Sequence, residues 1–371
     1  MNSRRAVGHE RLRIGVDAHV LDGRPQGSRT WLLHTLRAAI PQAPGIDWLV
    51  YTHSPESFAP FAMFPNARHR PIPFTRASMR LGFFWPWALW RDRCTATLFQ
   101  YHGPPVLRSR QLLTVHDLLF ESHPEHFPAV MRWRLRLLTR HAGARALGVL
   151  VVSNWTQSEI IRRYRLDPAR VFLAPNGLPE RSYRPRNPDR RTVLFVGRIE
   201  PRKNLGLLLE AFDRMRTPGR RLVVIGQADP HHHGSGRVLA RLQGREDISH
   251  LAGISDGELD MYYSRAAVLA FPSAGEGFGM PVLDALRAGT PVVASDRTAI
   301  PEVAGGFAAL FDPGADDAVD RLAMLLDEAI ANPPVHDPDL LATHLANFSW
   351  TRSAKALLDA ISLLPGGLKG S

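Results

Sequence analysis

The sequence lacks the features that mark a secreted, disulfide-bonded or membrane-spanning protein. Its 371 residues include one cysteine, Cys94, which excludes an intramolecular disulfide and a cysteine metal cluster and favours a reducing compartment. The first residues contain no apolar segment of the kind that signal peptides carry. The longest uncharged apolar run, residues 81–90, has about half the length that a membrane-spanning helix needs. We therefore expect a folded cytoplasmic protein.

Lysine is also scarce, although the net charge is +11 and the chain has 46 basic residues. The first 180 residues hold 24 arginines, no lysine and only 12 acids, so the excess positive charge lies in the first half. Such a basic half could bind nucleic acid, an anionic membrane or a diphosphate-bearing acceptor. A general bias toward arginine in the composition explains the excess charge equally well. The three lysines are Lys203, Lys355 and Lys369. Lys203, which follows a strand pattern, is a lone lysine among many arginines, and this suggests that a compact ammonium is needed there.

Apolar strand patterns alternate with helical patterns along both halves of the chain. This alternation predicts an α/β fold with two Rossmann-like, doubly wound parallel-sheet domains. A Pro/Arg-rich stretch at residues 180–191 reads as a linker, which gives domains at 1–180 and 181–349. A final helical pattern at 350–365 is expected to pack back on the first domain. Ligands should bind in the cleft that faces the carboxyl ends of both sheets.

The stretch FVGRIEPRKN, residues 195–204, lies where a strand ends and a helix is about to begin. Gly197 allows the turn, and Arg198 and Lys203 could both reach a phosphate over the start of that helix. A chance placement of these cations on a solvated loop is the alternative. The pattern favours a phosphate site.

The stretch EGFGMPVLDALRAG, residues 276–289, follows another strand and also opens a helix. Backbone amides of Gly277, Phe278 and Gly279 could approach a ligand oxygen, and Pro281 fits the first turn of the helix. Glu276 would oppose a bound anion, so it is better suited to accept hydrogen bonds from sugar hydroxyls. Asp284, one turn into the helix, could hold a ribose or simply compensate the helix dipole.

Three other site types fit these residues less well. A glycosidase needs two carboxylates that face each other across one bond, which one acid on the loop and one inside the helix cannot easily do. A dehydrogenase needs a third glycine, which EGFGMP lacks. Three adjacent histidines at 231–233 suggest a solvated loop rather than a metal site, and the Asp-Pro-Asp at 337–339 lies far from the phosphate residues, so we expect no metal and no cofactor.

The first half contributes two further candidates. TVHDLLF, residues 114–120, ends a strand with His116, which could hydrogen-bond a substrate hydroxyl or simply terminate the strand. The loop at Gly27 opens the first helix, so its amides could also face the cleft.

Taken together, these segments resemble glycosyltransferase family 4, the retaining group that has the GT-B fold of two Rossmann-like domains. The resemblance rests on segments that occur in the family's order over nearly the whole chain: TVHDLLFESHPEHF, VVSNWTQSEI, VFLAPNG, VGRIEPRKNL, GISDGELDMYYSRA, PSAGEGFGMPVLDALRAGTPVVAS and PEVAGGFAALFDP. It implies a metal-independent transfer of a sugar from a nucleoside diphosphate with the anomeric configuration retained.

The resemblance also implies roles for the candidate residues. Arg198 and Lys203 would bind the diphosphate and stabilise it as a leaving group, and Glu276 would contact the donor sugar. Asp284, the second acid of the segment that begins at Glu276, would hold the ribose, and the backbone near Ile254 would contact the base. His116 would lie beside the sugar, Gly27 near the phosphate, and Glu302 would be structural.

The sequence departs from the family pattern at two places. The second acid is Asp284 where relatives usually have glutamate, and Arg29 stands where a second glycine is common in the first-domain loop. The resemblance suggests mannose from GDP-mannose, with UDP-sugars as the alternative, and a glycan or polyprenyl-diphosphate-linked saccharide as acceptor.

Two expectations concern partners. The aromatic and basic segment 80–93 could dock at an anionic membrane, which would place the protein at the inner face of the plasma membrane, or it could be a partly buried helix of the first domain. A basic nucleic-acid-binding protein is the function of another class, but it leaves Glu276 and the glycine loop without a role.

Overall fold

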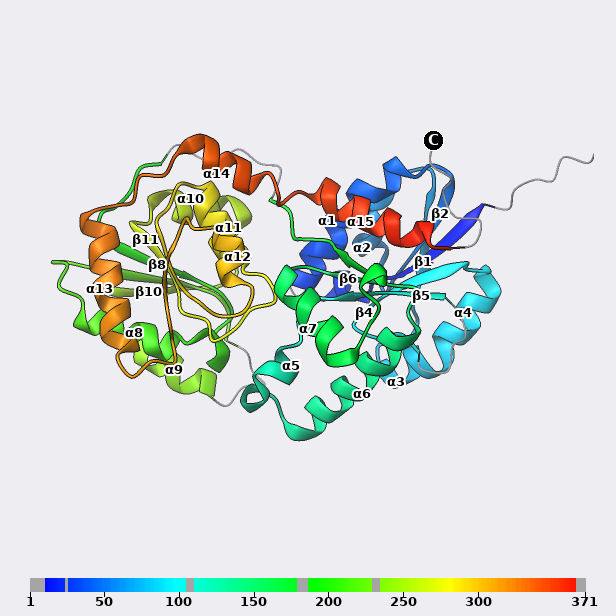
Figure 1. Cartoon of the computed structure of the whole chain (residues 1–371), viewed down its shortest axis with the longest axis horizontal. Coiled ribbons are helices and arrows are strands. Elements are labelled where there is room, and N and C mark those ends of the chain that lie inside the picture. The colour runs from blue at the N-terminus through cyan, green and yellow to red at the C-terminus, as the bar shows by residue number, and fades with distance from the viewer. Residues whose placement is uncertain (1–10, 24–25, 105–109, 179–185, 229–233, 365–371) are drawn as a thin grey trace, which may run out of the picture.

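The computed structural model describes residues 11–23, 26–104, 110–178, 186–228 and 234–364, and the chain forms two α/β halves side by side (Figure 1). The first sheet is all parallel with strand order β3-β2-β1-β4-β5-β6-β7. Its strands are β1 (Leu12–Asp17), β2 (Ile46–Thr52), β3 (Ala67–Pro71), β4 (Ala96–Gln100), β5 (Arg110–Val115), β6 (Gly148–Val151) and β7 (Val171–Leu173).

The second sheet is also parallel, with order β10-β9-β8-β11-β12-β13. Its strands are β8 (Thr192–Val196), β9 (Arg221–Ile225), β10 (Ile248–Leu251), β11 (Val268–Phe271), β12 (Val292–Ser295) and β13 (Ala309–Phe311). The two doubly wound parallel sheets confirm the predicted fold class. Strand order reverses between β1 and β4 in one sheet and between β8 and β11 in the other, and ligands bind at such switch points.

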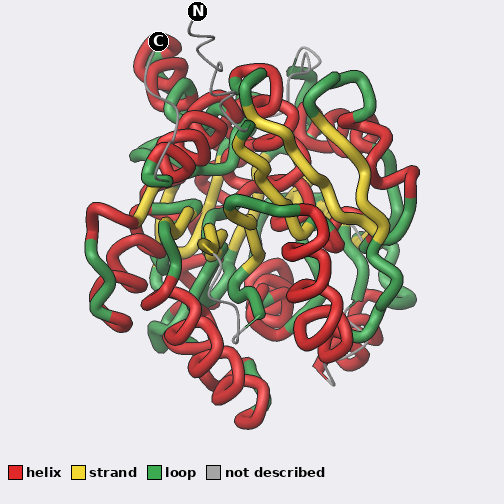
Figure 2. Tube along the Cα trace, turned by 90° about the vertical axis from the view of Figure 1, so that its right-hand side faces the viewer, coloured by secondary structure: helices red, strands yellow, loops and turns green. Residues whose placement is uncertain are grey.

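Helices cover both faces of each sheet, as the strands enclosed by helices in Figure 2 show for the first half. Those of the first half are α1 (Gly27–Gln42), α2 (Pro55–Phe58), α3 (Ala77–Met79), a π-helical turn (Arg80–Phe84), α4 (Trp85–Asp92), α5 (Leu119–Ser122), α6 (Ala129–Arg145) and α7 (Asn154–Tyr164). Those that follow are α8 (Leu205–Arg214), α9 (Gly234–Leu242), α10 (Asp256–Arg265), α11 (Met280–Arg287), α12 (Ile300–Ala304), α13 (Ala318–Ala331), α14 (Pro338–Leu345) and α15 (Trp350–Ser362).

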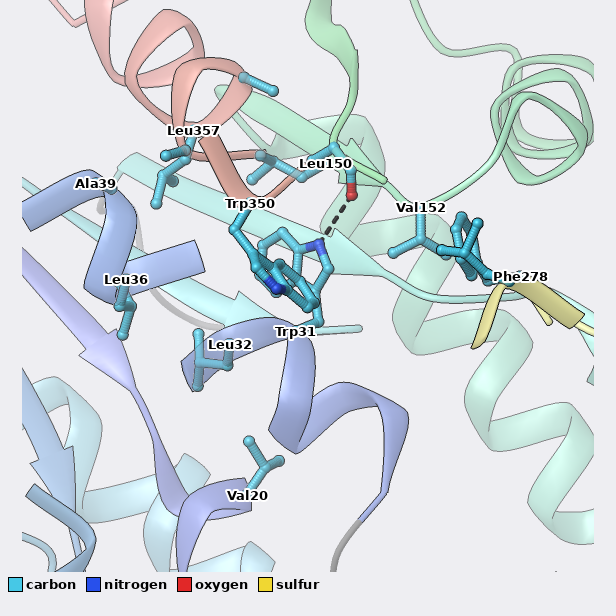
Figure 3. Packing of buried hydrophobic residues seen from close by; sticks show 14 of the residues in the cluster. Val20, Trp31, Leu32, Leu36, Ala39, Leu150, Val152, Phe278, Trp350 and Leu357 are labelled. Carbon is cyan, nitrogen blue, oxygen red and sulfur yellow. Dashed lines mark hydrogen bonds between the residues drawn. The ribbon is translucent and has the colours of Figure 1, made fainter. Parts of the chain in front are cut away.

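The last helix, α15, lies on the first half and packs against α1 (Figure 1). Ser349 caps it by accepting a hydrogen bond from the Arg352 amide, and one apolar face carries Trp350 and Leu357 into the core. Trp350 stacks on His34 of α1 with ring centroids 4.9 Å apart. Figure 3 shows Trp350 and Trp31 in the layer between the two helices. The chain therefore passes between the halves twice, once within 174–191 and once before α15.

Part of the linker stretch, residues 180–185, lies outside the described residues. The described part is tied to the second half, because the amides of Asn187 and Asp189 donate to carbonyls of Ser264 and Arg265. The segment 80–93 buries Phe84, Trp85 and Leu89 and exposes other aromatic rings, so it is a helical segment with one face in the core. No helix in the described ranges is long and apolar enough to cross a membrane.

Candidate functional site

A cavity of about 380 Å³ lies between the two halves, at the carboxyl ends of both sheets. Its wall from the first half consists of Gln26, Gly27, Ser28, Tyr101, His116, Asp117, Val152 and Asn176. Its wall from the second half consists of Arg198, Glu200, Arg202, Lys203, Glu276, Gly277, Phe278, Gly279, Met280 and Pro281. Several of these residues follow β4, β5, β8 and β11, three of which flank the switch points of the two sheets.

The turn after β8 supplies the positive charge. Pro201, Arg202 and Lys203 form a 3-10 turn that ends at Asn204, which has a positive φ of 51°. The Asn204 side chain donates to the Pro272 carbonyl at 3.1 Å, which fastens this turn to the end of β11. The turn therefore holds the two adjacent cations of positions 202 and 203 beside the loop that carries Glu276.

Glu276 is the buried anion of the site, and two cations hold it. The Lys203 Nζ atom lies 2.6 Å from one carboxylate oxygen, and an Arg202 nitrogen lies 3.0 Å from the other. A second Arg202 nitrogen lies 2.6 Å from Glu200. Although burial favours the neutral acid, Arg202 and Lys203 lower the pKa of Glu276 to about 2. Burial lowers the pKa of Lys203, and the Glu276 carboxylate opposes that change.

The backbone around Glu276 is fixed by Thr298. The Glu276 amide donates to the Thr298 hydroxyl oxygen at 2.7 Å, and that hydroxyl lies 2.9 Å from the Glu276 carbonyl, to which it donates. Thr298 lies between β12 and α12, so a neighbouring turn holds the backbone of the loop that precedes α11. The carboxylate therefore projects from a loop whose amide and carbonyl at Glu276 are both hydrogen-bonded.

The glycine loop delivers the chain to α11 under tight constraints. Gly279 precedes the helix with a φ of +115°, a conformation that favours glycine. Met280 is the first helical residue and Pro281 the second, so proline still sits where no intrahelical amide is needed. Gly279, Met280 and Pro281 at the start of α11 line the cavity, and the start of a helix attracts anions.

His116 and Asp117 face this loop from the first half. The His116 Nε2 atom lies 2.8 Å from the Gln100 amide oxygen, and removal of the ring from water lowers the pKa of His116 to about 4. His116 is therefore a neutral hydrogen-bonding group at neutral pH. Burial raises the pKa of Asp117, whose carboxylate accepts from the Tyr101 hydroxyl at 3.2 Å and from the Leu119 amide at 3.1 Å.

Gly27 is the first residue of α1 and lines the cavity, with open space around its Cα. Its neighbour Arg29 points away, because its Nε donates to the Leu21 carbonyl at 3.2 Å. The substitution of arginine for a second glycine therefore places a side chain on the preceding loop rather than in the cavity.

Three of the predicted residues are not among the described residues that line the cavity. Gly197 lies directly after β8, with its amide donating to the Ile225 carbonyl at 2.9 Å. Ile254 is half-buried just before α10 and packs against the core, and Asp284 is buried within α11. Arg198, Lys203, His116, Glu276, Gly27 and the glycine loop are brought together. The histidines at 231–233 lie outside the described residues.

The sequence interpretation missed Arg202, Glu200 and Tyr101, and it gave no role to Asp117, which follows His116 at the cleft. Arg202 and Asp117 directly adjoin predicted residues, so their neighbours were the available signal. The sequence contained no signal for Tyr101 or Glu200, because a single tyrosine after a strand and one acid in a basic loop are both common.

The two halves also meet through Glu302 on α12. Its two carboxylate oxygens accept from the backbone amides of Asn154 and Trp155, at 2.9 and 3.1 Å. These amides begin α7 in the first half, so Glu302 caps a helix of the opposite half. Burial raises the pKa of Glu302, and the two amides oppose that change. Within the described residues, no group of three histidine, cysteine, aspartate or glutamate side chains is placed to hold a metal ion.

Two family patterns match consecutive parts of the chain. The family described as Glycosyltransferase Family 4 matches residues 26–181, and the family described as Glycosyl transferases group 1 matches residues 180–336. The chain is 31% identical over 243 residues to the O-antigen chain mannosyltransferase B of Escherichia coli. That match covers 59% of this chain and 62% of that protein, so it spans less than two thirds of the relative.

Solved structures share the fold at low identity. Sucrose-phosphate synthase from Thermosynechococcus elongatus superposes with a TM-score of 0.69 at 19% identity, over 94% of this chain and 96% of that one. HepE of Anabaena, solved in complex with UDP and glucose, superposes with a TM-score of 0.65 at 17% identity, over 95% and 97% of the two chains. Both structural similarities show that the fold, with its arrangement of two halves, is shared.

Proposed function

Because the chain belongs to glycosyltransferase family 4, we propose that it transfers a hexose from a nucleoside-diphosphate sugar to a glycan or lipid-linked saccharide acceptor, with the anomeric configuration retained. Such a transferase would serve the synthesis of surface polysaccharide or glycolipid. In this proposal the donor binds the second half and the acceptor the first.

The observation that carries the proposal is the meeting of cations, a helix start and a buried carboxylate in one cavity. Arg198 and Lys203 line the cavity together with the first turn of α11, so a diphosphate there would meet both charged side chains and the positive end of a helix dipole. Glu276, 2.6 Å from Lys203, lies where the sugar attached to that diphosphate would be.

In this proposal the residues have separate roles in the reaction. When the bond between the sugar and the diphosphate breaks, negative charge grows on the diphosphate, and Arg198 and Lys203 would stabilise it without a metal ion. The ionised Glu276 would accept hydrogen bonds from sugar hydroxyls, and neutral His116 would contact the sugar from the first half. Gly27 would approach the phosphate, and Asp284 and the backbone near Ile254 would serve the ribose and base. No cofactor is required in this scheme.

For the donor we propose mannose from GDP-mannose, with UDP-sugars as the alternative. The similarity to an O-antigen chain mannosyltransferase supports mannose. Thermal-shift screening with UDP, GDP and ADP and their sugars tests this choice, because a ligand that binds the folded state raises its apparent stability by an amount that grows with the logarithm of the ratio of its concentration to its Kd. We place the activity in the cytoplasm, at the inner face of the plasma membrane.

Two alanine variants test the site. Lys203→Ala and Glu276→Ala should each lower turnover of the donor that binds by about 10²-fold or more, since each removes a charged contact to the reacting groups. Lys355→Ala is the matched control, because Lys355 is exposed on α15 and pairs only with Asp359 one turn away, among the interactions of the described residues. If both site variants keep the turnover of this control, the proposed function is wrong.

A further inference from the structure

The proposed transfer releases a proton, because the acceptor hydroxyl loses its hydrogen when its oxygen bonds to the sugar. Among the described residues, the acids that line the first cavity are Asp117, Glu200 and Glu276. Glu200 lies 2.6 Å from an Arg202 nitrogen, and Glu276 lies 2.6 Å from the Lys203 Nζ atom. A proton on either of these two carboxylates would break an ion pair that is largely removed from water, which is costly. Neither of the two is therefore suited to take the proton.

Asp117 differs from these two acids in its partners. Its carboxylate accepts hydrogen bonds from the Tyr101 hydroxyl at 3.2 Å and from the Leu119 amide at 3.1 Å, and neither donor is charged. Burial raises the pKa of Asp117, whereas the charge of Arg202 and the two hydrogen bonds oppose this change and the charge of Glu276 adds to it. In the described part of the chain, Asp117 is the acid of this cavity that can accept a proton without loss of an ion pair.

Two other groups at the cavity could accept the proton. His116 is a weak base, because its pKa is about 4 and its Nε2 atom is held 2.8 Å from the Gln100 amide oxygen. The second group is the leaving diphosphate itself. Arg198 and Lys203 would stabilise the charge on the diphosphate oxygens, and this makes those oxygens weaker bases. Both groups therefore compete poorly with a buried carboxylate whose pKa is raised.

Asp117 also lies where the acceptor and the sugar would meet. It follows β5 in the half to which we assign the acceptor, and it lines the cavity beside His116. A Cβ atom added to Gly277 would lie 2.8 Å from the Cβ atom of Asp117. The Asp117 side chain thus lies against the loop that carries Glu276, the residue proposed to bind the sugar. An acceptor hydroxyl that approaches the sugar from the first half would therefore meet this carboxylate.

The backbone of Tyr101, which donates to Asp117, is strained. Its φ is +59°, in the left-handed region that a bulky residue rarely adopts. The Tyr101 amide donates to the Thr114 carbonyl at 2.8 Å, which holds this conformation beside the end of β5. In this position the Tyr101 hydroxyl reaches the Asp117 carboxylate. Backbone strain of this kind is concentrated at functional sites, and here it fixes the direction of one acid.

We propose that Asp117 is the catalytic base of the transfer. The acceptor oxygen forms a bond to the anomeric carbon, and the bond from that carbon to the diphosphate breaks with its electron pair on the diphosphate. The hydroxyl proton passes to the Asp117 carboxylate. Tyr101 and Leu119 each occupy one lone pair of a different carboxylate oxygen, so each oxygen keeps another lone pair for the acceptor. The inference rests on the proposed function and adds the residue that receives the proton.

Azide tests this role, because azide is a nucleophile that has no proton to lose. Asp117→Asn keeps the size of the side chain but cannot take up the proton. With GDP-mannose, or the UDP-sugar that thermal shift selects in its place, and with methyl α-mannoside or water as acceptor, the variant should release nucleotide about 10²-fold more slowly than the wild type. Sodium azide should restore the rate to within about tenfold of the wild type, with the glycosyl azide as product. Asp359→Asn is the matched control, since Asp359 is exposed on α15 and pairs with Lys355.

A pH profile distinguishes a base from a residue that only supports the structure. A base works when it is ionised, so the wild-type rate should fall as the pH is lowered through the pKa of Asp117, which burial holds above its ordinary value. This fall should be absent from Asp117→Asn. The pKa of Glu276, about 2, is too low to produce it. A fall that persists unchanged in Asp117→Asn would assign the titration to another group and overturn the inference.

Other outcomes would overturn the inference as well. A wild-type rate in Asp117→Asn would mean that the diphosphate takes the proton, and a slow variant that azide does not restore would mean that Asp117 has another role. Loss of the thermal shift with GDP and UDP in both Asp117→Asn and Asp117→Ala would assign Asp117 to the fold or to the nucleotide site. In these cases the wild type still turns over the donor, so the proposed function stands. A wild type that neither binds nor turns over these donors contradicts the proposed function, and this inference fails with it.

Discussion

Replacement of Glu276 by glutamine should make the cavity bind nucleoside diphosphates more tightly while turnover falls. Glu276 neutralises Lys203 and Arg202 in the structure, at 2.6 and 3.0 Å. A diphosphate held by Arg198 and Lys203 must compete with this carboxylate for Lys203. The glutamine side chain keeps the shape and removes the charge, so Lys203 becomes available to the ligand, whereas Arg202 still pairs with Glu200.

The pKa of Glu276 sets the size of the effect. The difference between its ordinary pKa of 4.5 and its pKa of about 2 corresponds to roughly 3 kcal/mol of stabilisation of the ionised, folded state. Because this pKa is lowered, the stabilisation is fully present above about pH 4.5 and is lost as the pH falls toward 2. Glu276→Gln should therefore lower the free energy of unfolding by about 3 kcal/mol at pH 7. If contacts between the bound diphosphate and the freed cation recover about half of this lost stabilisation, the Kd for GDP or UDP falls roughly tenfold.

Isothermal titration with GDP and UDP measures this change, and urea unfolding measures the loss of stability. Turnover in the same variant should fall by about 10²-fold or more, because the contact to the sugar is lost. Glu210→Gln, exposed on α8, controls for loss of one negative charge. Unchanged or weaker nucleotide binding in Glu276→Gln would show that the carboxylate does not compete for Lys203, and the charge argument would fail.

Two more predictions concern contacts between the halves, and a third concerns the protonation of His116. Gly277→Ala should lower turnover about 10²-fold and enlarge the radius of gyration in X-ray scattering. A Cβ there would lie 2.1 Å from the His116 carbonyl oxygen and would push the two halves apart. Gly257→Ala is the control, because a Cβ at Gly257 meets open space. Glu302→Ala should destabilise the protein to urea by about 1 kcal/mol through loss of the cap on α7, and an unchanged midpoint would refute that role. Since the pKa of His116 is about 4, the ring should not titrate near pH 6.5. The pH profile of kcat/KM should therefore have no inflection near pH 6.5 that is due to His116. An inflection that is present in the wild type and absent from His116→Gln would mean that the ring is charged there.

The periodicity of the sequence indicates most strands of the two sheets but not β3, β7 and β13. Strands β3, β7 and β13 are edge strands. β3 reads ARHRP, which has almost no apolar residue, whereas β7 (VFL) and β13 (ALF) are apolar but only three residues long, too short to show a pattern. An edge strand has one neighbour and needs little apolar surface, so its pattern resembles that of a loop. The helix α14 was also hidden, because its Pro338 suggested a loop although proline is favoured in a first turn.

The site was predictable where a residue type is unusual for its surroundings. Lys203 was found because lysine is rare in this chain, and Glu276 because an acid beside a phosphate loop needs a reason. Arg202 was missed because an arginine in an arginine-rich chain carries no such signal. Its role follows only from the tertiary structure, in which it joins Glu200 and Glu276 across two loops.

The glycines of the loop before α11 have a second role that the sequence could not indicate. They were interpreted as residues that let amides approach a ligand oxygen, and Gly279 fits that view. Gly275 and Gly277 instead face the first half: a Cβ at Gly275 would lie 2.9 Å from the His123 ring, and one at Gly277 would lie 2.8 Å from the Asp117 side chain. Because both glycines flank Glu276, the loop that positions the carboxylate also sets how closely the halves approach. A side chain at either position would thus move Glu276 and His116 apart without touching a charge, so the two glycines set the distance between the halves at the proposed reacting centre.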